Sequence, residues 1–106
     1  MKLNDFSRGW LVGDFLPALI KSKDIEVGIK YYSAGDKEPK HVHKISDEYT
    51  IIIFGKVFMN GVEYKEKDIV FVEREIYSDF ECLENCALLV LKTPSIPGDK
   101  YFLEKD

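Results

Sequence analysis

The sequence is poor in residues on which several common functions depend. Its 106 residues include two cysteines, two histidines and one tryptophan, and only two of the 15 basic residues, Arg8 and Arg74, are arginine. Proteins that bind nucleic acids hold the backbone phosphates with clustered lysine and arginine. Here the lysines are scattered and the formal net charge is −4, so we expect no nucleic-acid partner.

Long apolar segments are missing as well. The longest uninterrupted apolar run, from Cys86 to Leu91, has six residues, whereas a membrane-spanning helix needs about 20. The first eight residues lack the apolar region of a secretory signal peptide. We therefore expect a cytoplasmic protein that has no membrane partner.

The two cysteines, Cys82 and Cys86, are four residues apart. If both lie on one extended strand, their Cα atoms are roughly 13 Å apart, beyond the reach of a disulfide bond. Only a tight turn at Glu84-Asn85 would bring them together. We expect the extended geometry and free thiols, because a reducing compartment also disfavours disulfides.

The chain does contain enough apolar material for one core. Hydrophobic residues make up 45% of the sequence and aromatic residues 13%, and a chain of this length folds as one domain. We assign residues 1–106 to a single domain, with 1–24 as an N-terminal extension and 93–106 as a C-terminal tail. Pro94 and Pro97 disfavour strand pairing in the tail, which we expect to wrap the surface or a neighbouring subunit.

Strand patterns dominate the middle of the chain. Residues 25–32 alternate with the period of a half-buried strand, whose predicted inward side chains are Ile25, Val27, Ile29 and Tyr31.

Further strands are expected at 49–54, 56–59, 62–64, 68–72 and 87–91. Asn60-Gly61 is a strong hairpin signal, because both central residues of a type I′ turn need positive φ. Only residues 14–23 suit a short helix, which Pro17 would limit. The pattern predicts an all-β fold, either a sandwich or a barrel.

Both histidines lie in one short segment, His41-Val42-His43, which is followed by Glu48. On a strand, positions 41 and 43 point to the same face with Cα atoms roughly 6.5 to 7 Å apart, so both imidazoles can reach one ion. A turn over 44–47 would bring the Glu48 carboxylate to the same point. Such a donor set suits a divalent transition metal: iron, manganese, nickel, zinc or cobalt. The alternative is two surface histidines, with Glu48 paired to Lys44 or Lys56.

The same segment resembles the first motif of the cupin superfamily. The residues that stand at the spacing of that motif are Gly35, His41, His43, Glu48 and Gly55, and the β-rich pattern continues the resemblance over about 25–92. The resemblance implies a small antiparallel β-barrel of jelly-roll type. It also implies a divalent metal held by His41, His43 and Glu48, to which many cupins add a further histidine.

The second cupin motif is incomplete in this chain. Its usual proline and glycine positions hold Glu73 and Glu75, and Ser78 stands where the last histidine ligand is expected. Asp79 would replace that ligand after a one-residue shift, a water molecule would complete the coordination, or the site would keep three ligands and leave room for a chelating substrate. Loss of the metal is the remaining alternative. Cys82 lies further along the predicted face of Ser78.

Glu48 and Tyr31 are the candidate catalytic residues. A phenol buried beside a metal or a histidine can be tuned to move a proton. The predicted alternation places Tyr31 on the inward face and favours it over Tyr64 and Tyr77, for which a core or rim position is the simpler interpretation.

The cavity around these residues is expected to be largely apolar. Thr50, Ile52 and Phe54 should share the inner face with Glu48, which is the usual composition of a small-molecule site. The acidic stretch 73–84 is interpreted as a solvated edge strand. If it lined the mouth of the cavity instead, it would favour neutral or cationic substrates.

These features favour a metal-binding cupin that acts on or binds a small polar metabolite or sugar; a catalytic version would be a metal-dependent oxidoreductase or isomerase. Two alternatives remain open. The run from His41 to Lys44 is similar to the His-x-His-Lys run of metal-free nucleotide-sugar isomerases, and a non-catalytic ligand-binding cupin would tolerate the incomplete second motif. By analogy with small cupins, we expect a homodimer that pairs through its sheets.

Overall fold

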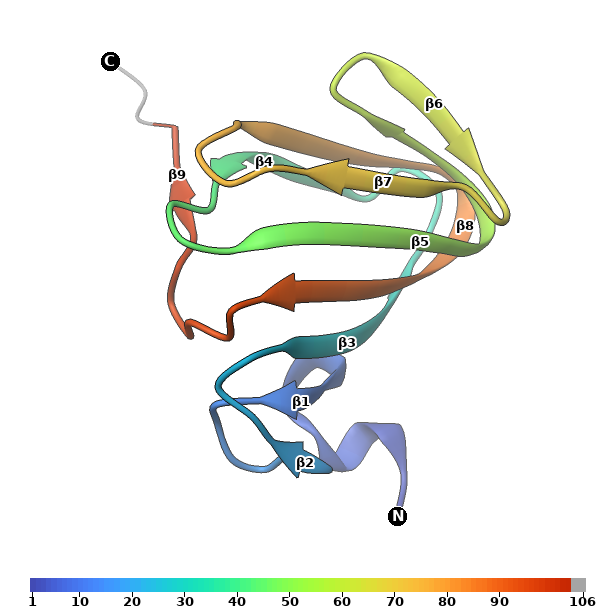
Figure 1. Cartoon of the computed structure of the whole chain (residues 1–106). Coiled ribbons are helices and arrows are strands. Elements are labelled where there is room, and N and C mark those ends of the chain that lie inside the picture. The colour runs from blue at the N-terminus through green and yellow to red at the C-terminus, as the bar shows by residue number, and fades with distance from the viewer. Residues whose placement is uncertain (104–106) are drawn as a thin grey trace.

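The computed structural model describes residues 1–103, which form a β-rich fold (Figure 1). Within this range, no helix is long and apolar enough to cross a membrane. The elements, in chain order, are the 3-10 turns η1 (Leu3–Asp5) and η2 (Ser7–Gly9) and the strands β1 (Trp10–Gly13), β2 (Ile20–Lys21), β3 (Glu26–Tyr32), β4 (Lys37–Val42), β5 (Asp47–Met59), β6 (Val62–Lys65), β7 (Ile69–Val72), β8 (Ser78–Thr93) and β9 (Tyr101–Phe102).

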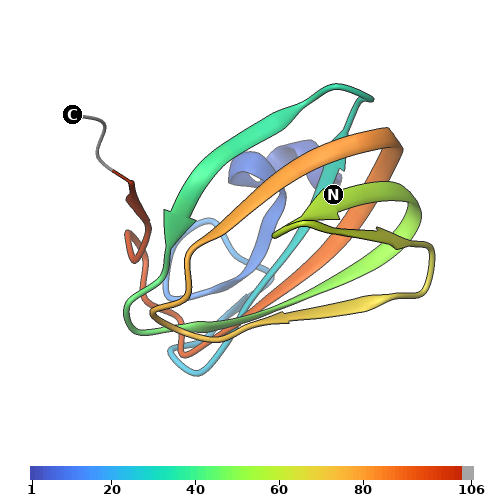
Figure 2. The same cartoon turned by 90° about the horizontal axis from the view of Figure 1, so that it is seen from above.

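All nine strands of residues 1–103 are hydrogen-bonded into one connected sheet. Its two longest strands, β5 and β8, bend so that two parts of it, called here the two sheets, face each other (Figure 2). The first half of β5 pairs with β7 and with the second half of β8, which also pairs with β3, and β1 follows beyond β3. The second half of β5 pairs with β6 and with the first half of β8, which also pairs with β4. Figure 2 shows the green β4 and the orange first half of β8 on one side of the fold, opposite β7 and the first half of β5. The all-β jelly-roll prediction is confirmed, although the sheets do not close into a barrel.

The turn at Asn60-Gly61 connects β5 to β6 as the sequence predicts. Both residues have positive φ, 48° and 82°, and Met59 pairs directly with Val62 across the turn. This is the geometry for which Asn-Gly is favoured in hairpins.

Both long strands bend where β5 passes Gly55. The pairing register shifts there, and Gly55 has φ 90°. A Cβ atom at Gly55 would lie 2.6 Å from Cys86 Cβ, so only glycine allows β8 to approach this closely.

The bend also brings the two thiols together, with Cys82 Sγ 3.3 Å from Cys86 Sγ. The expected wide separation of the two cysteines on one extended strand is therefore wrong. No turn at Glu84-Asn85 causes the approach, because β8 continues as one strand over Ser78–Thr93, and both cysteines are free thiols.

Three other expectations for local structure are wrong. Residues 14–23 do not form a helix, because Ile20–Lys21 pairs in parallel with Val12–Gly13 as β2. The acidic stretch does not form an edge strand, because residues 78–84 lie between β4 and β5. The C-terminal tail does contain a strand after its prolines: β9 pairs with His41 and Val42 of β4.

The inward face of β3 is the opposite of the predicted one. Tyr31 is 64% exposed, whereas Glu26 and Gly28 are buried. The alternation of the strand is correct, but the side chains that face the other sheet come from the even-numbered, more polar set. On β5, Thr50 and Ile52 are buried as predicted, while Phe54 is 44% exposed because the bulge next to Gly55 turns it outward.

Candidate functional site

A cavity of about 1010 Å³ opens between the sheets and is lined by residues from β1, β3, β4, β5 and β8, from the N-terminal segment that contains η1 and η2, and from the loop 96–100. Its walls are not largely apolar as expected, because four acidic and four basic side chains line it together with both histidines. These charged residues are Glu26, Glu38, Glu48, Asp99, Arg8, Lys30, Lys92 and Lys100.

His41 and His43 stand side by side on one wall, at the end of β4. They are 6% and 5% exposed, and their ring centroids are 5.2 Å apart with the planes inclined by 70°. His41 Nδ1 lies 3.0 Å from the carbonyl oxygen of Pro39. A carbonyl can only accept, so Nδ1 carries the proton and Nε2 of His41 keeps a free lone pair.

Both imidazoles are held in the neutral form. Burial lowers the pKa of His41. Burial, followed by the positive charge of Lys92, lowers the pKa of His43 to about 4. Neutral imidazole is the form that binds metals and accepts protons, so the predicted role of the pair is chemically possible at neutral pH.

Glu48 lies on the opposite sheet and faces the same cavity. It is 9% exposed and pairs in register with Lys92 of β8. Burial raises the pKa of the Glu48 carboxyl group, and the charge of Lys92 opposes that rise. The Thr50 hydroxyl group donates to Glu48 Oε2 over a long 3.5 Å. A cation in the cavity would therefore stabilise the ionised form of this carboxylate.

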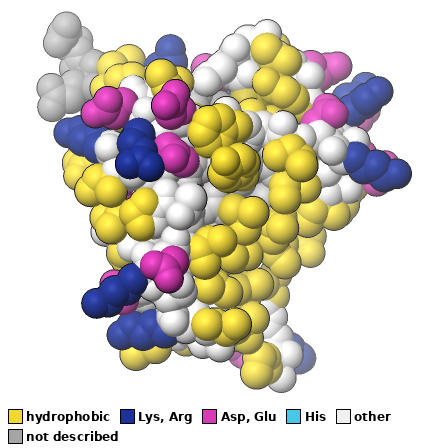
Figure 3. Space-filling model, viewed as in Figure 1, with side chains coloured by type: hydrophobic (Ala, Val, Ile, Leu, Met, Phe, Trp, Pro, Cys, Tyr) yellow, Lys and Arg dark blue, Asp and Glu magenta, His cyan; other side chains and the backbone are white. Residues whose placement is uncertain are grey.

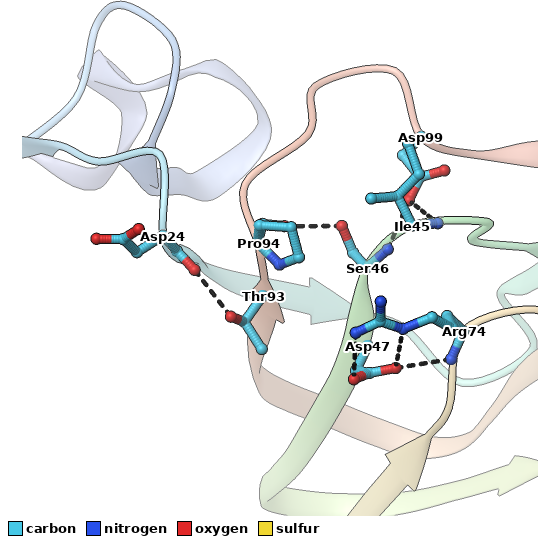
Figure 4. A network of polar contacts seen from close by, with 8 residues as sticks. All are labelled: Asp24, Ile45, Ser46, Asp47, Arg74, Thr93, Pro94 and Asp99. Atoms are coloured by element: carbon cyan, nitrogen blue, oxygen red, sulfur yellow. Dashed lines mark hydrogen bonds and ion pairs between the residues drawn. The ribbon is translucent and has the colours of Figure 1, made fainter.

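The turn between the histidines and Glu48 is fixed by Asp99. Its carboxylate accepts the backbone N–H groups of Lys44, Ile45 and Ser46, each over 2.9 Å. Burial by itself would raise the pKa of Asp99, but these three hydrogen bonds outweigh it and lower the pKa. The Ser46 hydroxyl group also donates to the Pro94 carbonyl oxygen over 2.7 Å. Figure 4 shows Asp99 and Pro94 beside Ile45 and Ser46 of the turn.

A second clamp holds the outer side of the same turn. Arg74 binds Asp47 through Nε and Nη2, over 3.1 and 3.0 Å, and through its backbone N–H group over 2.9 Å (Figure 4). This hydrogen bonding lowers the pKa of Asp47. The backbone N–H group of Glu75 donates to the His43 carbonyl oxygen over 2.7 Å. The predicted turn over 44–47 is thus present and anchored to two other loops.

The donor set fits a divalent metal in kind but is not assembled around one point. Two neutral imidazoles and one carboxylate are the ligand types that iron, manganese, nickel, zinc and cobalt accept. However, within residues 1–103 no three side chains of histidine, cysteine, aspartate or glutamate are gathered closely enough to hold an ion. The two histidines are adjacent, and Glu48 does not complete a group of three with them.

Of the candidates for a fourth ligand, only Ser78 faces the cavity. It is buried, pairs directly with His41 and lines the cavity. Asp79 is instead bound to the hairpin, because its Oδ1 accepts the backbone N–H group of Asn60 over 2.9 Å. Cys82 lies beside Cys86 in the apolar core. The expectation that Asp79 substitutes for the missing histidine therefore has no support in this geometry.

The tyrosine next to Tyr31 occupies the position expected for a catalytic phenol. The inverted face of β3 puts Tyr32 inside, where its hydroxyl group donates to Glu38 Oε1 over 3.1 Å. Its ring packs 4.6 Å from that of Phe80. Burial and the neighbouring Glu38 raise the pKa of Tyr32. Tyr31 itself is mostly exposed, so the inward orientation on which its catalytic role depended is wrong.

Sequence reasoning also missed Glu26, Lys30 and Lys92. The register places Glu26, Lys92 and Glu48 in one row across three neighbouring strands, on the inner face of the sheet. The alternation in 25–32 marked Glu26 and Lys30 as sharing one face, but polar residues are usually outside. Nothing in the sequence links residue 92 to residue 48, since that pairing depends on the long-range register.

Comparison with known proteins gives the fold. No protein-family profile and no curated protein sequence matches the chain. Among solved structures, KdgF from Halomonas sp. superposes with a TM-score of 0.65 at 16% identity, over 71% of this chain and 74% of that one.

Two further structures agree over more of the chain. An uncharacterized protein with a double-stranded β-helix domain from Klebsiella pneumoniae has a TM-score of 0.73 at 16% identity, over 99% of this chain and 96% of that one. The DMSP lyase DddQ from Ruegeria pomeroyi has a TM-score of 0.68 at 20% identity, over 80% of this chain and 47% of that one. At these identities the similarity shows the fold alone.

Proposed function

Because the chain has the cupin fold, we propose that it binds a small polar metabolite in the cavity between its sheets, beside a divalent metal ion held by His41, His43 and Glu48. The observation that carries this proposal is the pair of buried, neutral imidazoles 5.2 Å apart on the wall of that cavity. Two similar structures bear the names KdgF and DMSP lyase. The lyase acts on a small molecule, which supports the same class of ligand here.

Each residue has a definite task in this proposal. The Pro39 carbonyl oxygen fixes the tautomer of His41 and leaves Nε2 as the donor atom. His43 remains unprotonated because it is buried and faces the charge of Lys92. Glu48 supplies the anionic oxygen. The bound ion would act as a Lewis acid toward an oxygen atom of the ligand, while Ser78 leaves the fourth side of the site open to that ligand.

Calorimetric titration of tag-free, chelator-treated protein with Mn²⁺, Zn²⁺ and Ni²⁺ tests the metal site. We expect one ion per chain, and we expect His41→Ala or Glu48→Gln to weaken binding at least about tenfold because each removes one donor. Glu63→Gln makes the same chemical change, carboxylate to amide, at an exposed position of β6 and serves as the matched control. Equal binding by wild type and His41→Ala would refute the site.

A metal-free function is the second candidate, and one observation favours it. Within residues 1–103, Glu48 forms no three-ligand group with the histidines. The positive charge of Lys92 already acts on both His43 and Glu48 and favours a lower pKa of each. In this version the cavity binds its ligand without an ion, and the hydrogen-bonded Tyr32–Glu38 pair or a neutral histidine exchanges a proton with it. Absence of metal binding in the same titration, together with retained ligand binding, would select this candidate.

We also propose that the chain forms a homodimer. The outer face of the sheet that contains β7, β5 and β8 carries exposed Ile53, Ile69 and Phe71 together with Tyr49, and Figure 3 shows hydrophobic side chains gathered over this side of the molecule. An apolar patch of this kind is typical of protein interfaces. Sedimentation velocity should give the mass of a dimer for the wild type and of a monomer for Phe71→Glu; a monomeric wild type would exclude the dimer.

A further inference from the structure

Trp10 of β1, the only tryptophan of the chain, packs against the inner face of β3 and lines the cavity. A Cβ atom at Gly28 would come within 2.7 Å of Trp10 Cε3, so the indole occupies the space that any larger residue at position 28 would need. The alternation of β3 places Glu26 and Lys30 on either side of Gly28 on the same face. Trp10 therefore forms part of the cavity wall between these two charged side chains.

Two ammonium groups meet at this indole. Lys30 Nζ lies 4.2 Å and Lys92 Nζ 5.2 Å from the ring centroid, within the range of cation–π contacts. Burial, followed by the positive charge of Arg8, lowers the pKa of Lys30 to about 8; Lys92 acts in the same direction, and Glu38 opposes it. The positive charges around this ring therefore repel one another, and Glu38 offsets this repulsion at Lys30 only in part.

Three carboxylates of the same cavity are already engaged by donors of the protein itself. Asp99 accepts three backbone N–H groups. Glu38 accepts a tyrosine hydroxyl group, and Glu26 accepts a serine hydroxyl group. Three of the four carboxylates of the cavity are thus satisfied, and the fourth, Glu48, has only the long contact to Thr50. Lys30 donates to the carbonyl oxygen of Arg8, but within residues 1–103 neither Lys30 nor Lys92 has an ion-pair partner.

We propose that Lys30 and Lys92, on either side of Trp10, form an anion-binding subsite that takes the carboxylate or phosphate group of a small metabolite. The proposal rests on the proposed function only in placing a small ligand in this cavity, and it does not require the metal. Lys92 of β8 pairs in register with Glu48 of β5, and its charge acts on His43. The subsite therefore borders the histidine pair. The ligand class is an organic anion, in contrast to the neutral or cationic ligands that an acidic rim would have favoured.

Quenching of Trp10 fluorescence tests the subsite directly, because no other tryptophan contributes to the signal. Iodide, caesium and acrylamide are compared on metal-stripped protein at constant ionic strength. We expect iodide to quench at least about threefold more strongly than caesium, because the two ammonium groups concentrate anions at the ring. Malonate and inorganic phosphate are then added separately as competitors, which distinguishes carboxylate from phosphate ligands.

Substitutions assign the effect to the two lysines. Lys30→Gln and Lys92→Gln should each lower the quenching constant of iodide for Trp10 fluorescence by about half or more, while the quenching constant of acrylamide stays unchanged. Lys92→Arg keeps the charge and should keep the iodide effect, which separates loss of charge from loss of fold. Lys65→Gln, on exposed β6, removes the same charge at a distance and serves as the control.

Two results would overturn the proposal. One is equal quenching by iodide and caesium in the wild type; the other is an iodide constant that neither malonate nor phosphate lowers. Both are measured without metal, so failure of the metal titration leaves this test intact, and failure of this test leaves the metal site untouched.

Discussion

The two ends of the interior differ sharply, although the same two strands build both. Along β5 the successive inward residues are Glu48, Thr50 and Ile52, and along β8, read in the opposite direction, they are Lys92, Val90, Leu88 and Cys86. Polarity therefore falls from one end of the fold to the other on both strands.

The polar end carries buried charges that need partners, and the apolar end is tightly packed around Val57 and Cys82, both 0% exposed. Burial of unpaired polar groups costs free energy, whereas burial of apolar groups stabilises. The difference teaches that stability comes mainly from the apolar end, so the polar end can hold groups that suit a ligand.

The strongest test of this division compares the two glycines of the first motif. Gly55→Ala should lower the free energy of unfolding by about 3 kcal/mol or more, because the added Cβ atom would collide with Cys86 at the apolar end. Gly35→Ala should cost only about 1 kcal/mol, since its φ of 95° is unfavourable for alanine but nothing lies within 4 Å of the new atom. Urea unfolding of both variants measures the difference, and equal losses would contradict the packing described for the bend.

The next effect concerns the loop that supports the polar end. Asp99→Ala should lower the free energy of unfolding at pH 7 by about 2 kcal/mol, because it leaves the backbone N–H groups of residues 44–46 without their acceptor.

The same carboxylate predicts a pH dependence. The pKa of Asp99 is lower in the folded chain than its ordinary value, so its stabilising contribution is present above that ordinary value and is lost as the pH falls through the folded pKa. The loss is therefore expected below about pH 4. In acid unfolding experiments, Asp99→Asn should lose less stability over that range than the wild type. If both proteins lost the same stability below about pH 4, the three hydrogen bonds would contribute little.

The smallest expected effect on stability is at the thiol pair. Cys82→Ala should lower the free energy of unfolding by about 1 kcal/mol, because it removes one buried sulfur atom from the apolar end.

Burial, together with the neighbouring Cys82, raises the pKa of Cys86 to about 12. Alkylation by iodoacetamide at pH 8 should therefore be at least about tenfold slower in the folded protein than in urea. Comparable rates would mean that this end is open to water.

Sequence patterns with a local physical cause were predicted correctly. The Asn60-Gly61 hairpin follows from positive φ at both residues. The two histidines lie side by side as expected, although β4 ends at Val42 and His43 follows it. The resemblance carried by residues 35–55 led to the correct fold, and the two glycines that bound this segment both have positive φ.

Features that depend on long-range pairing could not be predicted. The alternation of β3 fixes two faces but does not say which one is buried, and the rule that polar residues lie outside fails where a cavity is polar. The alternation therefore predicts Tyr31 on the inner face, where the structure has Tyr32. The bulge at Gly55 likewise turns Phe54 outward, since one extra residue shifts the later side chains of β5. The bend at the same place shortens the distance between the two thiols of β8. Lys92 has no local signal at all.

The most direct test of the ligand-binding polar end is elemental analysis of the protein prepared without a histidine tag or chelator, with His41→Ala prepared in parallel. The proposed site predicts about one equivalent of a divalent transition metal per chain in the wild type and a near-complete loss in the variant. Wild-type protein that holds no metal even after reconstitution, or a variant that retains the same amount, would contradict it.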